Sequence, residues 1–457
     1  MAKRLVLAEK PSVARDIARV LQCAQQGNGY LEGKDAVVTW ALGHLVTLAD
    51  PEEYDDKYKT WKLEDLPMLP ERLKLTVIRE TAKQFKIVKA QLERGDVGEI
   101  VIATDAGREG ELVARWILEK AQVKKPVKRL WISSVTDRAI REGFARLRPG
   151  KDFENLYRAA EARSAADWYV GLNATRALTT KFNAQLNAGR VQTPVVAIVA
   201  KREEEIRNFQ PKTYFGIEAR TGDGLALTWR DKRTGGGRSF DEAYVAGIVR
   251  RLEGADAKIV RIERKAKKTP PPALYDLTEL QRDGNRLFGY SAKETLAAVQ
   301  RLYEQHKAVT YPRTDSRYLS SDMAATLQER LRACGVGPYR ELAAKARSMP
   351  LPKQPAFIND AKVSDHHAIV PTEEPPNLSA MSERERKIYD LIVRRFLAAM
   401  FPPFEYEQVT VHADIRGETF VARGKTVTAA GWKEVYERGA AGAGADGTED
   451  ENEDGEA

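Results

Sequence analysis

Residues 310–316, Thr-Tyr-Pro-Arg-Thr-Asp-Ser, put a phenol, a guanidinium and a carboxylate on one short segment. A tyrosine hydroxyl has a pKa of about 10, so at neutral pH it attacks phosphorus only where nearby cations stabilise the phenolate and the crowded phosphate. Arg313 can supply that charge to Tyr311. Pro312 biases Tyr311 toward an extended backbone, which favours a stiff loop or a strand edge. Taken alone, the segment is more typical of a surface turn, so the rest of the chain has to decide its role.

A second group of side chains follows two predicted strands. Glu9 and Lys10 come directly after the first strand, and Asp105 and Glu109 follow the second. In open sheets of parallel strands, ligands bind at the carboxyl ends of the strands. Carboxylates gathered there favour Mg²⁺, which prefers oxygen ligands. Such carboxylates can also simply complement helix dipoles; we prefer that role for Glu111 and metal binding for Asp105, which stands beside a glycine-rich turn.

The elements that carry these side chains alternate between strand and helix. Short apolar runs predict strands at 3–8 and 99–104, and Pro11 with an apolar stripe behind it predicts a helix after the first strand. This alternation predicts a parallel sheet covered on both faces. We therefore expect residues 1–150 to form one α/β domain with a Rossmann-like sheet.

The rest of the chain divides by its patterns. A helical stretch is followed by strand-like runs, then by a mostly helical block that holds Tyr311, and then by strands again. Strands on both sides of a helical block indicate a β domain into which a helical domain is inserted, so the fold class is multidomain α/β plus α+β. The predicted units are 1–150, 151–209, 210–272, 273–403, 404–436 and a disordered acidic tail at 437–457.

Composition bounds the class of protein. The chain has 457 residues, too many for one hydrophobic core. No apolar run approaches the roughly 20 residues that cross a bilayer, and the N-terminus does not resemble a signal peptide, so we expect a cytoplasmic protein. The cysteines Cys23 and Cys334 lie far apart, which excludes a disulfide framework and a zinc ribbon and predicts two buried thiols.

The net charge hides an asymmetry along the chain. The formal charge is +8, but residues 446–457 hold seven acidic residues, so the remaining chain carries +15. A strongly positive surface favours a polyanionic partner such as nucleic acid, although basic chains often only carry solvated lysines. The composition is thus consistent with DNA as a partner but does not by itself identify DNA as the partner.

Four motifs together identify a family. Glu9 after a strand, with Asp-Ala-Gly-Arg-Glu-Gly-Glu at 105–111, resembles the Toprim metal-binding domain of topoisomerases, bacterial primases and some nucleases. The other three motifs are Ala-Gly-Arg-Val-Gln-Thr-Pro at 188–194, the tyrosine segment, and Ser-Asp-His-His-Ala-Ile-Val-Pro-Thr at 364–372. In this order they resemble the bacterial type IA DNA topoisomerases, closest to the topoisomerase III branch, over about residues 1–436.

The resemblance implies roles at the reacting phosphate. Tyr311 matches the nucleophile that forms a 5′-phosphotyrosyl bond to single-stranded DNA. Arg313 and Lys10 would stabilise the phosphate by charge. Glu9 would protonate the departing 3′-oxygen and reactivate it in reverse. His366 matches the histidine that hydrogen-bonds around the phosphate, with the adjacent His367 as the less favoured substitute.

The resemblance also implies a cofactor and a DNA-binding groove. Mg²⁺ would be held by Glu9 and Asp105, with Glu109 in support. A splayed base could stack on an aromatic ring of the groove for roughly 1–3 kcal/mol, although an indole on an alanine-rich helix such as Trp168 is more typical of a core. The residues implied for DNA contact are Trp61, Trp168, Arg176, Ala188, Gly189, Arg190, Val191, Gln192, Thr193 and Arg313.

The chain departs from the family pattern twice. Gly107 stands where many members carry a second aspartate, a variation also found in topoisomerase III relatives, and one fewer carboxylate should weaken Mg²⁺ binding. No counterpart of the family's later strands and second helical half follows Trp432, so we expect apolar surface around residues 151–209 to lack its partner.

These features predict a type IA topoisomerase that breaks one strand, passes another and rejoins the first without ATP. No Gly-x-x-x-x-Gly-Lys-Ser/Thr phosphate loop occurs in the sequence, which agrees with that mechanism. Two alternatives stay open: a remnant that binds or cleaves single-stranded DNA without strand passage, and a Toprim nuclease that needs no tyrosine. We expect a monomer associated with the nucleoid, with a helicase as a candidate partner.

Overall fold

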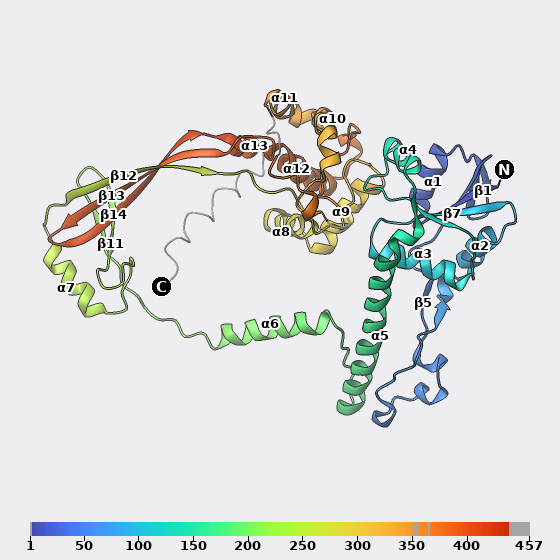
Figure 1. The fold of residues 1–457 in the computed structure, drawn as a ribbon. Coiled ribbons are helices and arrows are strands. Elements are labelled where there is room, and N and C mark those ends of the chain that lie inside the picture. The colour runs from blue at the N-terminus through green and yellow to red at the C-terminus, as the bar shows by residue number, and fades with distance from the viewer. Residues whose placement is uncertain (1, 351–354, 364–365, 438–457) are drawn as a thin grey trace.

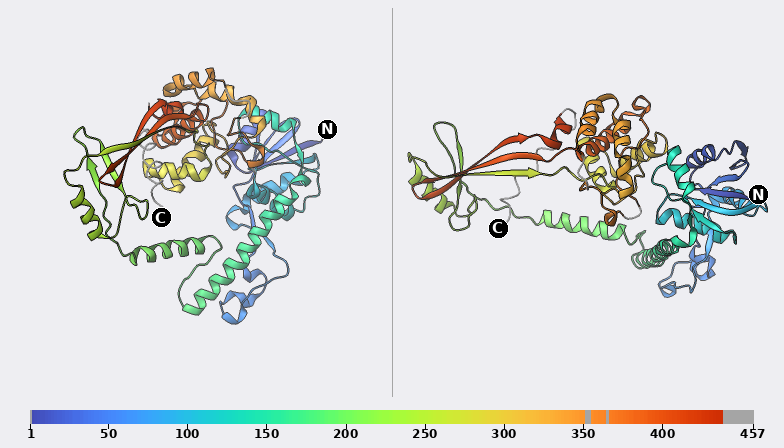
Figure 2. Two further views of the ribbon diagram at one scale, coloured as in Figure 1. Left: turned by 60° about the vertical axis from the view of Figure 1, so that its left-hand side comes forward. Right: turned by 45° about the horizontal axis from the view of Figure 1, so that its top comes forward.

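The computed structural model describes residues 2–350, 355–363 and 366–437. An α/β domain lies at one end of the molecule and packs against a helical domain (Figure 1). Long strands run from the helical domain to a distal sheet, and two helices lead back from the α/β domain toward that sheet (Figures 1 and 2). No helix in these ranges is long and apolar enough to cross a membrane.

The first sheet places the ends of two central strands side by side. Strand β1 (Lys3–Ala8) pairs in parallel with β4 (Ala36–Trp40) and with β7 (Val97–Ala103). The edges add antiparallel strands, which the sequence analysis did not predict. The strand order is β2 (Gln25–Gly27), β3 (Tyr30–Glu32), β4, β1, β7, β8 (Val127–Arg129) and β9 (Arg148–Pro149).

Side chains of β1 alternate between two apolar clusters, as a sheet covered on both faces requires. Leu5 and Leu7 pack with α2 (Ala82–Leu92) and α3 (Arg108–Lys120), whereas Val6 and Ala8 pack with α1 (Pro11–Val20) and α4 (Asp137–Ala145). The second cluster continues into the helical domain, so the two domains share one core. A small ribbon of β5 (Val46–Leu48) and β6 (Leu75–Val77) stands beside this sheet.

Two helices lead away from the first domain. Helix α5 (Glu154–Phe182) packs on α3, and α6 (Gln192–Arg207) follows it. No residue of α6 is buried, and its apolar side chains Val196, Ile198 and Val199 are 66%, 69% and 57% exposed. The segment in which the sequence predicted unpartnered apolar surface does expose such side chains.

The distal sheet joins strands from both sides of the helical domain. All its pairings are antiparallel. Helix α7 (Glu242–Leu252), which the sequence analysis missed, packs its Val245 and Ile248 into the core of this sheet. The strand order is β10 (Glu218–Arg220), β11 (Ala226–Arg230), β14 (Glu418–Ala429), β13 (Phe404–Ile415) and β12 (Lys258–Thr269).

The helical domain surrounds an irregular segment that carries Tyr311. A short bridge of Val309 with Pro371 holds that segment against residues 366–372, and a second bridge pairs Ile369 with Tyr275, which precedes the first helix of this domain. Cys334 is buried here and Cys23 in the first domain, both as free thiols, which confirms that prediction. The helices are α8 (Leu277–Phe288), α9 (Ala292–Glu304), α10 (Leu327–Cys334), α11 (Arg340–Ser348), α12 (Glu383–Ala398) and the short α13 (Glu434–Glu437).

Candidate active site

Two carboxylates meet at the carboxyl ends of β1 and β7. Glu9 follows β1 and Asp105 lies just beyond β7, and the parallel pairing of these strands brings their ends together. The backbone N–H of Asp105 donates a hydrogen bond to Glu9 Oε2 over 3.1 Å. Strand adjacency thus creates the acidic pair that the sequence predicted at this edge.

A buried ion pair holds the turn after Asp105. Arg129, on the neighbouring strand β8, donates to Glu111 Oε2 over 2.9 Å, and neither side chain is exposed. Its guanidinium also donates to the carbonyl oxygens of Thr104 and Asp105, over 2.9 and 2.7 Å. Glu111 therefore has a structural role, as preferred from the sequence, but through Arg129 rather than through a helix dipole alone.

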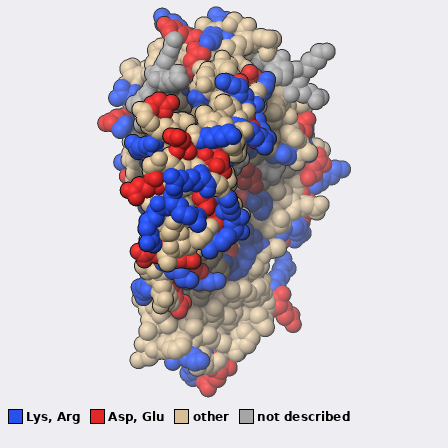
Figure 3. Space-filling view, turned by 90° about the vertical axis from the view of Figure 1, so that its left-hand side faces the viewer, with Lys and Arg blue, Asp and Glu red and all other residues tan. Residues whose placement is uncertain are grey.

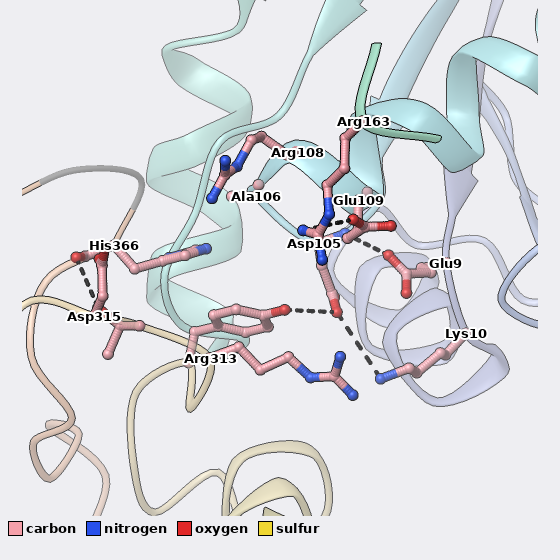
Figure 4. A pocket seen from close by; sticks show the side chains of 14 residues that line it. Glu9, Lys10, Asp105, Ala106, Arg108, Glu109, Arg163, Arg313, Asp315 and His366 are labelled. Atoms are coloured by element: carbon pink, nitrogen blue, oxygen red, sulfur yellow. Dashed lines mark hydrogen bonds and ion pairs between the residues drawn. The ribbon is translucent and has the colours of Figure 1, made fainter. Parts of the chain in front are cut away.

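Tyr311 reaches this site from the helical domain. Its backbone N–H donates to the Ser133 carbonyl oxygen of the first domain over 3.0 Å. Its ring packs on Tyr303 and His366, with centroids 5.4 and 4.3 Å away. The phenol Oη donates to Asp105 Oδ2 over 3.3 Å, and the residue is only 8% exposed (Figure 4).

Cations surround the acidic pair. Lys10 Nζ lies 2.6 Å from Glu304 Oε1 and 3.9 Å from Asp105 Oδ2. Lys10 and Arg313 both point toward the Asp105 carboxylate (Figure 4). These groups line a cavity of about 330 Å³ between the two domains. The cavity therefore brings the Tyr311 phenol together with the carboxylates of Glu9 and Asp105 and the cations of Lys10 and Arg313.

Burial and like charge shift the proton affinities in this cavity. Burial and the neighbouring Asp105 carboxylate raise the pKa of Glu9 to about 7, against the opposing effect of Lys10 and Arg313. Burial raises the pKa of Asp105 too, although Lys10 lowers it in part. Burial, with the charges of Asp105 and Glu9, raises the pKa of the Tyr311 phenol well above 10. At neutral pH the phenol is therefore protonated and Glu9 exchanges a proton readily.

Glu109 stands apart from the acidic pair. It lines the same cavity, but its carboxylate is 59% exposed and lies 3.5 Å from Arg163 and 3.9 Å from His44. Within the described ranges, no three acidic, histidine or cysteine side chains are close enough to hold a metal ion together. Glu9 and Asp105 thus lie together, and Glu109 is not gathered with them.

His366, and not His367, lines the cavity. His366 is 3% exposed, and neither ring nitrogen has a hydrogen-bond partner in the part of the chain that the structure describes. Burial lowers its pKa to about 4, so the ring is neutral at pH 7. A side chain on Gly107 would place its Cβ 4.0 Å from His366 Nε2, so the glycine leaves space beside an unpartnered nitrogen.

Two residues predicted to contact DNA are buried instead. Trp168 is 8% exposed and its indole N–H donates to the Ala49 carbonyl oxygen over 2.9 Å. Arg176 is 4% exposed and binds the Tyr58 carbonyl oxygen and Glu52. Both therefore fasten the segment around residues 49–58 to α5, and in this structure neither offers a face on which a base could stack.

The remaining predicted DNA contacts lie on accessible surface. Trp61 is 43% exposed, with the Arg176 guanidinium 5.0 Å from its ring centroid. Arg190 is exposed and lies 3.2 Å from Asp167 of α5. The others surround it where α5 turns into α6: Ala188, Gly189, Val191, Gln192 and Thr193.

The structure adds residues that sequence reasoning missed. Glu304, at the end of α9, pairs with Lys10, and Arg163, on α5, faces Glu109. Arg108 and Asp315 also line the cavity. Asp315 and Arg108 lay inside motifs that were already recognised, whereas nothing local in the sequence marked Glu304 or Arg163.

Comparison with known proteins defines the class. The model of a DNA topoisomerase family matches residues 151–454, and that of the Toprim domain matches residues 4–135. The chain belongs to the DNA topoisomerase family, and it joins a Toprim domain to the central domains of the type IA enzymes, which confirms the resemblance.

Relatives place it more closely within the family. The chain is 66% identical over 437 residues to DNA topoisomerase 3 of Bacillus cereus strain ATCC 14579 and 61% identical to that of Bacillus subtilis strain 168, covering 96% of this chain in both comparisons. It spans about 60% of the length of these relatives. Its fold matches full-length topoisomerase I from Thermotoga maritima with a TM-score of 0.69, at 24% identity, over 95% of this chain and 67% of that one.

Proposed function

We propose that this chain breaks one strand of DNA by forming a 5′-phosphotyrosyl bond at Tyr311, lets another strand pass and rejoins the first without ATP, thereby relaxing or decatenating DNA. The observation that carries the proposal is the hydrogen bond from Tyr311 Oη to Asp105 Oδ2 in a cavity that Glu9, Lys10 and Arg313 share. A phenol, proton acceptors and cations are the groups that phosphoryl transfer to tyrosine needs.

The chemical step balances with these residues. Tyr311 Oη forms a bond to phosphorus as the bond between phosphorus and the 3′-oxygen breaks. The phenol proton passes to Asp105, its hydrogen-bond acceptor. Glu9, with a pKa of about 7, donates a proton to the departing 3′-oxygen. Rejoining reverses each transfer, and the bond energy is kept in the phosphotyrosine.

Lys10 and Arg313 act by charge. Both face the region where negative charge grows on phosphate, and fixed cations in a partly buried cavity act more strongly than in water. The neutral His366 ring, with unpartnered nitrogens, can donate or accept a hydrogen bond at the phosphate.

We also propose that Glu9 and Asp105 hold Mg²⁺. Two adjacent carboxylates, both with raised pKa values, fit a divalent cation that keeps several waters. When bound, the ion would offset phosphate charge. Each carboxyl group has two oxygens, so holding a cation and exchanging a proton are compatible. Glu109 lies apart, which agrees with a weak site.

The DNA strand is proposed to follow the surface from Trp61 past Arg190 to the cavity. Lysine and arginine side chains also gather over the middle of the face at the distal sheet, among acidic ones, whereas the lower part of that face carries few charges (Figure 3). Binding should weaken with salt because phosphate contacts release counterions. We further propose a monomer acting on nucleoid DNA, with a helicase as a candidate partner, on the basis of the family resemblance.

A second candidate is cleavage of single-stranded DNA without strand passage. The exposed apolar side chains of α6 favour it, because a helix with no buried residue is poorly fixed as part of a closed gate.

One experiment separates these functions. A single-stranded oligonucleotide labelled at its 3′ end is incubated with the protein and Mg²⁺, and denaturing gels show whether label stays on protein, while supercoiled plasmid is assayed for relaxation. An adduct with relaxation supports the full reaction, and an adduct alone supports the second candidate. Cleavage that persists in Tyr311→Phe would indicate a Toprim nuclease, and undiminished activity in excess chelator would refute the Mg²⁺ site. Absence of any adduct would overturn the proposal.

A further inference from the structure

A second cavity, of about 740 Å³, lies where the distal sheet joins the helical domain. The proline runs at 270–272 and 402–403 form one part of its wall. The first run directly follows β12 and the second directly precedes β13. The cavity therefore touches two of the chain connections that link the distal sheet to the domain carrying Tyr311.

The rest of the wall is mostly apolar. Its large side chains are Met349, Phe357, Met400 and Phe401. The side chains of proline, methionine and phenylalanine present apolar surface, and binding of an apolar molecule that displaces water from this surface is favourable. The volume is that of pockets which hold small organic ligands.

Among the described residues of this wall, Arg317 is the one with a charged side chain. Its Nε atom is buried without a hydrogen-bond partner, and across the described residues no ion pair or hydrogen bond engages the rest of its guanidinium. Arg317 is half-buried, so its guanidinium stands at the edge of this apolar surface, and its planar fork matches a carboxylate. The neighbouring Tyr318 phenol already accepts from Lys362 Nζ over 3.1 Å.

We propose that this cavity binds a small carboxylic acid with an apolar body, its carboxylate on Arg317 and its body between the prolines and Phe357. Arg317 lies four residues after Arg313 on the same segment. The carbonyl oxygen of Tyr318 accepts from the Ala368 N–H over 2.8 Å, two residues beyond His366. Such a ligand bridges the sheet connections and the segment that carries the active-site residues.

The test measures binding of 2-naphthoate to the full chain by isothermal titration calorimetry. The uncharged amide, 2-naphthamide, has the same ring and serves as the ligand control. We expect naphthoate to bind at least about tenfold more tightly than the amide, because a hydrogen-bonded carboxylate gains that much from a guanidinium. Arg317→Gln should weaken naphthoate by at least about tenfold and leave the amide unchanged.

Matched variants locate the effect. Arg332→Gln removes an exposed arginine of α10 outside the cavity and should not alter binding. Ile198→Glu disrupts the exposed apolar side chains of α6 and should not alter it either. Thermal unfolding shows whether Arg317→Gln remains folded. Arg317→Lys keeps the charge without the planar fork, and it should bind naphthoate with an affinity between those of the unchanged chain and Arg317→Gln. Equal affinity for acid and amide, loss of binding in Ile198→Glu, or unchanged binding in Arg317→Gln would overturn the proposal.

Discussion

Replacement of Arg129 by methionine should destabilise the first domain and loosen the turn after Asp105. Arg129 is completely buried and pairs with the equally buried Glu111 over 2.9 Å. The substitution keeps an unbranched apolar side chain of similar length but removes the charge. Glu111 then retains Arg115, 3.0 Å away, as its remaining partner.

The expected loss follows from desolvation. Removing one partner of a buried ion pair costs about 3–5 kcal/mol, because the other charge stays buried without full compensation. Arg115 still neutralises part of the Glu111 charge, so we expect about 3 kcal/mol. Removing both charges, in Arg129→Met with Glu111→Leu, should be less destabilising than the single change by roughly 1–2 kcal/mol, although the carbonyl oxygens that Arg129 served remain unpaired.

Urea unfolding followed by tryptophan fluorescence gives the loss of free energy in the transition of the first domain, which contains Trp116 and Trp131. The adduct assay supplies a second reading, because the lost hydrogen bond from Arg129 to the Asp105 carbonyl oxygen should reduce cleavage even where the protein is fully folded. A loss below about 1 kcal/mol, or a double variant less stable than the single one, would refute this account of the buried pair.

Three further predictions concern other parts of the chain. Burial lowers the pKa of His367 from 6.5 to about 4, so the unfolded chain binds a proton at this residue before the folded chain does as the pH falls. The free energy of unfolding should therefore drop by about 3 kcal/mol between pH 6.5 and 4 because of this group. His367→Gln should reduce this dependence on pH when stability is measured by urea unfolding at a series of pH values. Val196→Glu with Ile198→Glu should reduce self-association in light scattering and change unfolding free energy by less than about 0.5 kcal/mol, because both positions are exposed; unchanged association would contradict this. Gly110→Ala should abolish the adduct, because its Cβ would stand 2.0 Å from the Asp105 carbonyl oxygen; a normal adduct yield would show that the turn can shift.

The neighbourhood of Glu9 and Asp105 could be predicted from the sequence where local rules determine it. The predicted strand at 3–8 matches β1, and the helix predicted to start at Pro11 matches the start of α1. The rule that parallel strands present their carboxyl ends at one edge then brings Glu9 and Asp105 together. Tyr311 could be placed there only through the family resemblance, because no local pattern relates residue 311 to residue 105.

Long-range packing accounts for what the sequence did not reveal. The Glu304 to Lys10 pair joins residues 294 positions apart, and no periodicity encodes it. The family resemblance assigned Trp168 to DNA contact, yet its indole N–H donates to the Ala49 carbonyl oxygen across the interface of α5 with the segment that follows β5. The bounds of β12, Lys258–Thr269, were not evident from the sequence, because both of its faces are largely exposed and alternation of apolar residues is not required there.

The burial of Tyr311 also bears on how DNA would reach it in the proposed reaction. In the proposed reaction, a phenol that is 8% exposed between two domains would meet a phosphate only after those domains move apart. Part of the interface is held by ion pairs, Lys10 with Glu304 and Lys307 with Asp16, both at 2.6 Å. Such pairs contribute only about 0–1 kcal/mol each where water reaches them, and a DNA phosphate can replace either carboxylate as the lysine's partner. On the proposed mechanism, the phosphates of an entering strand would therefore offset part of the cost of opening, because they would replace the carboxylates that Lys10 and Lys307 leave.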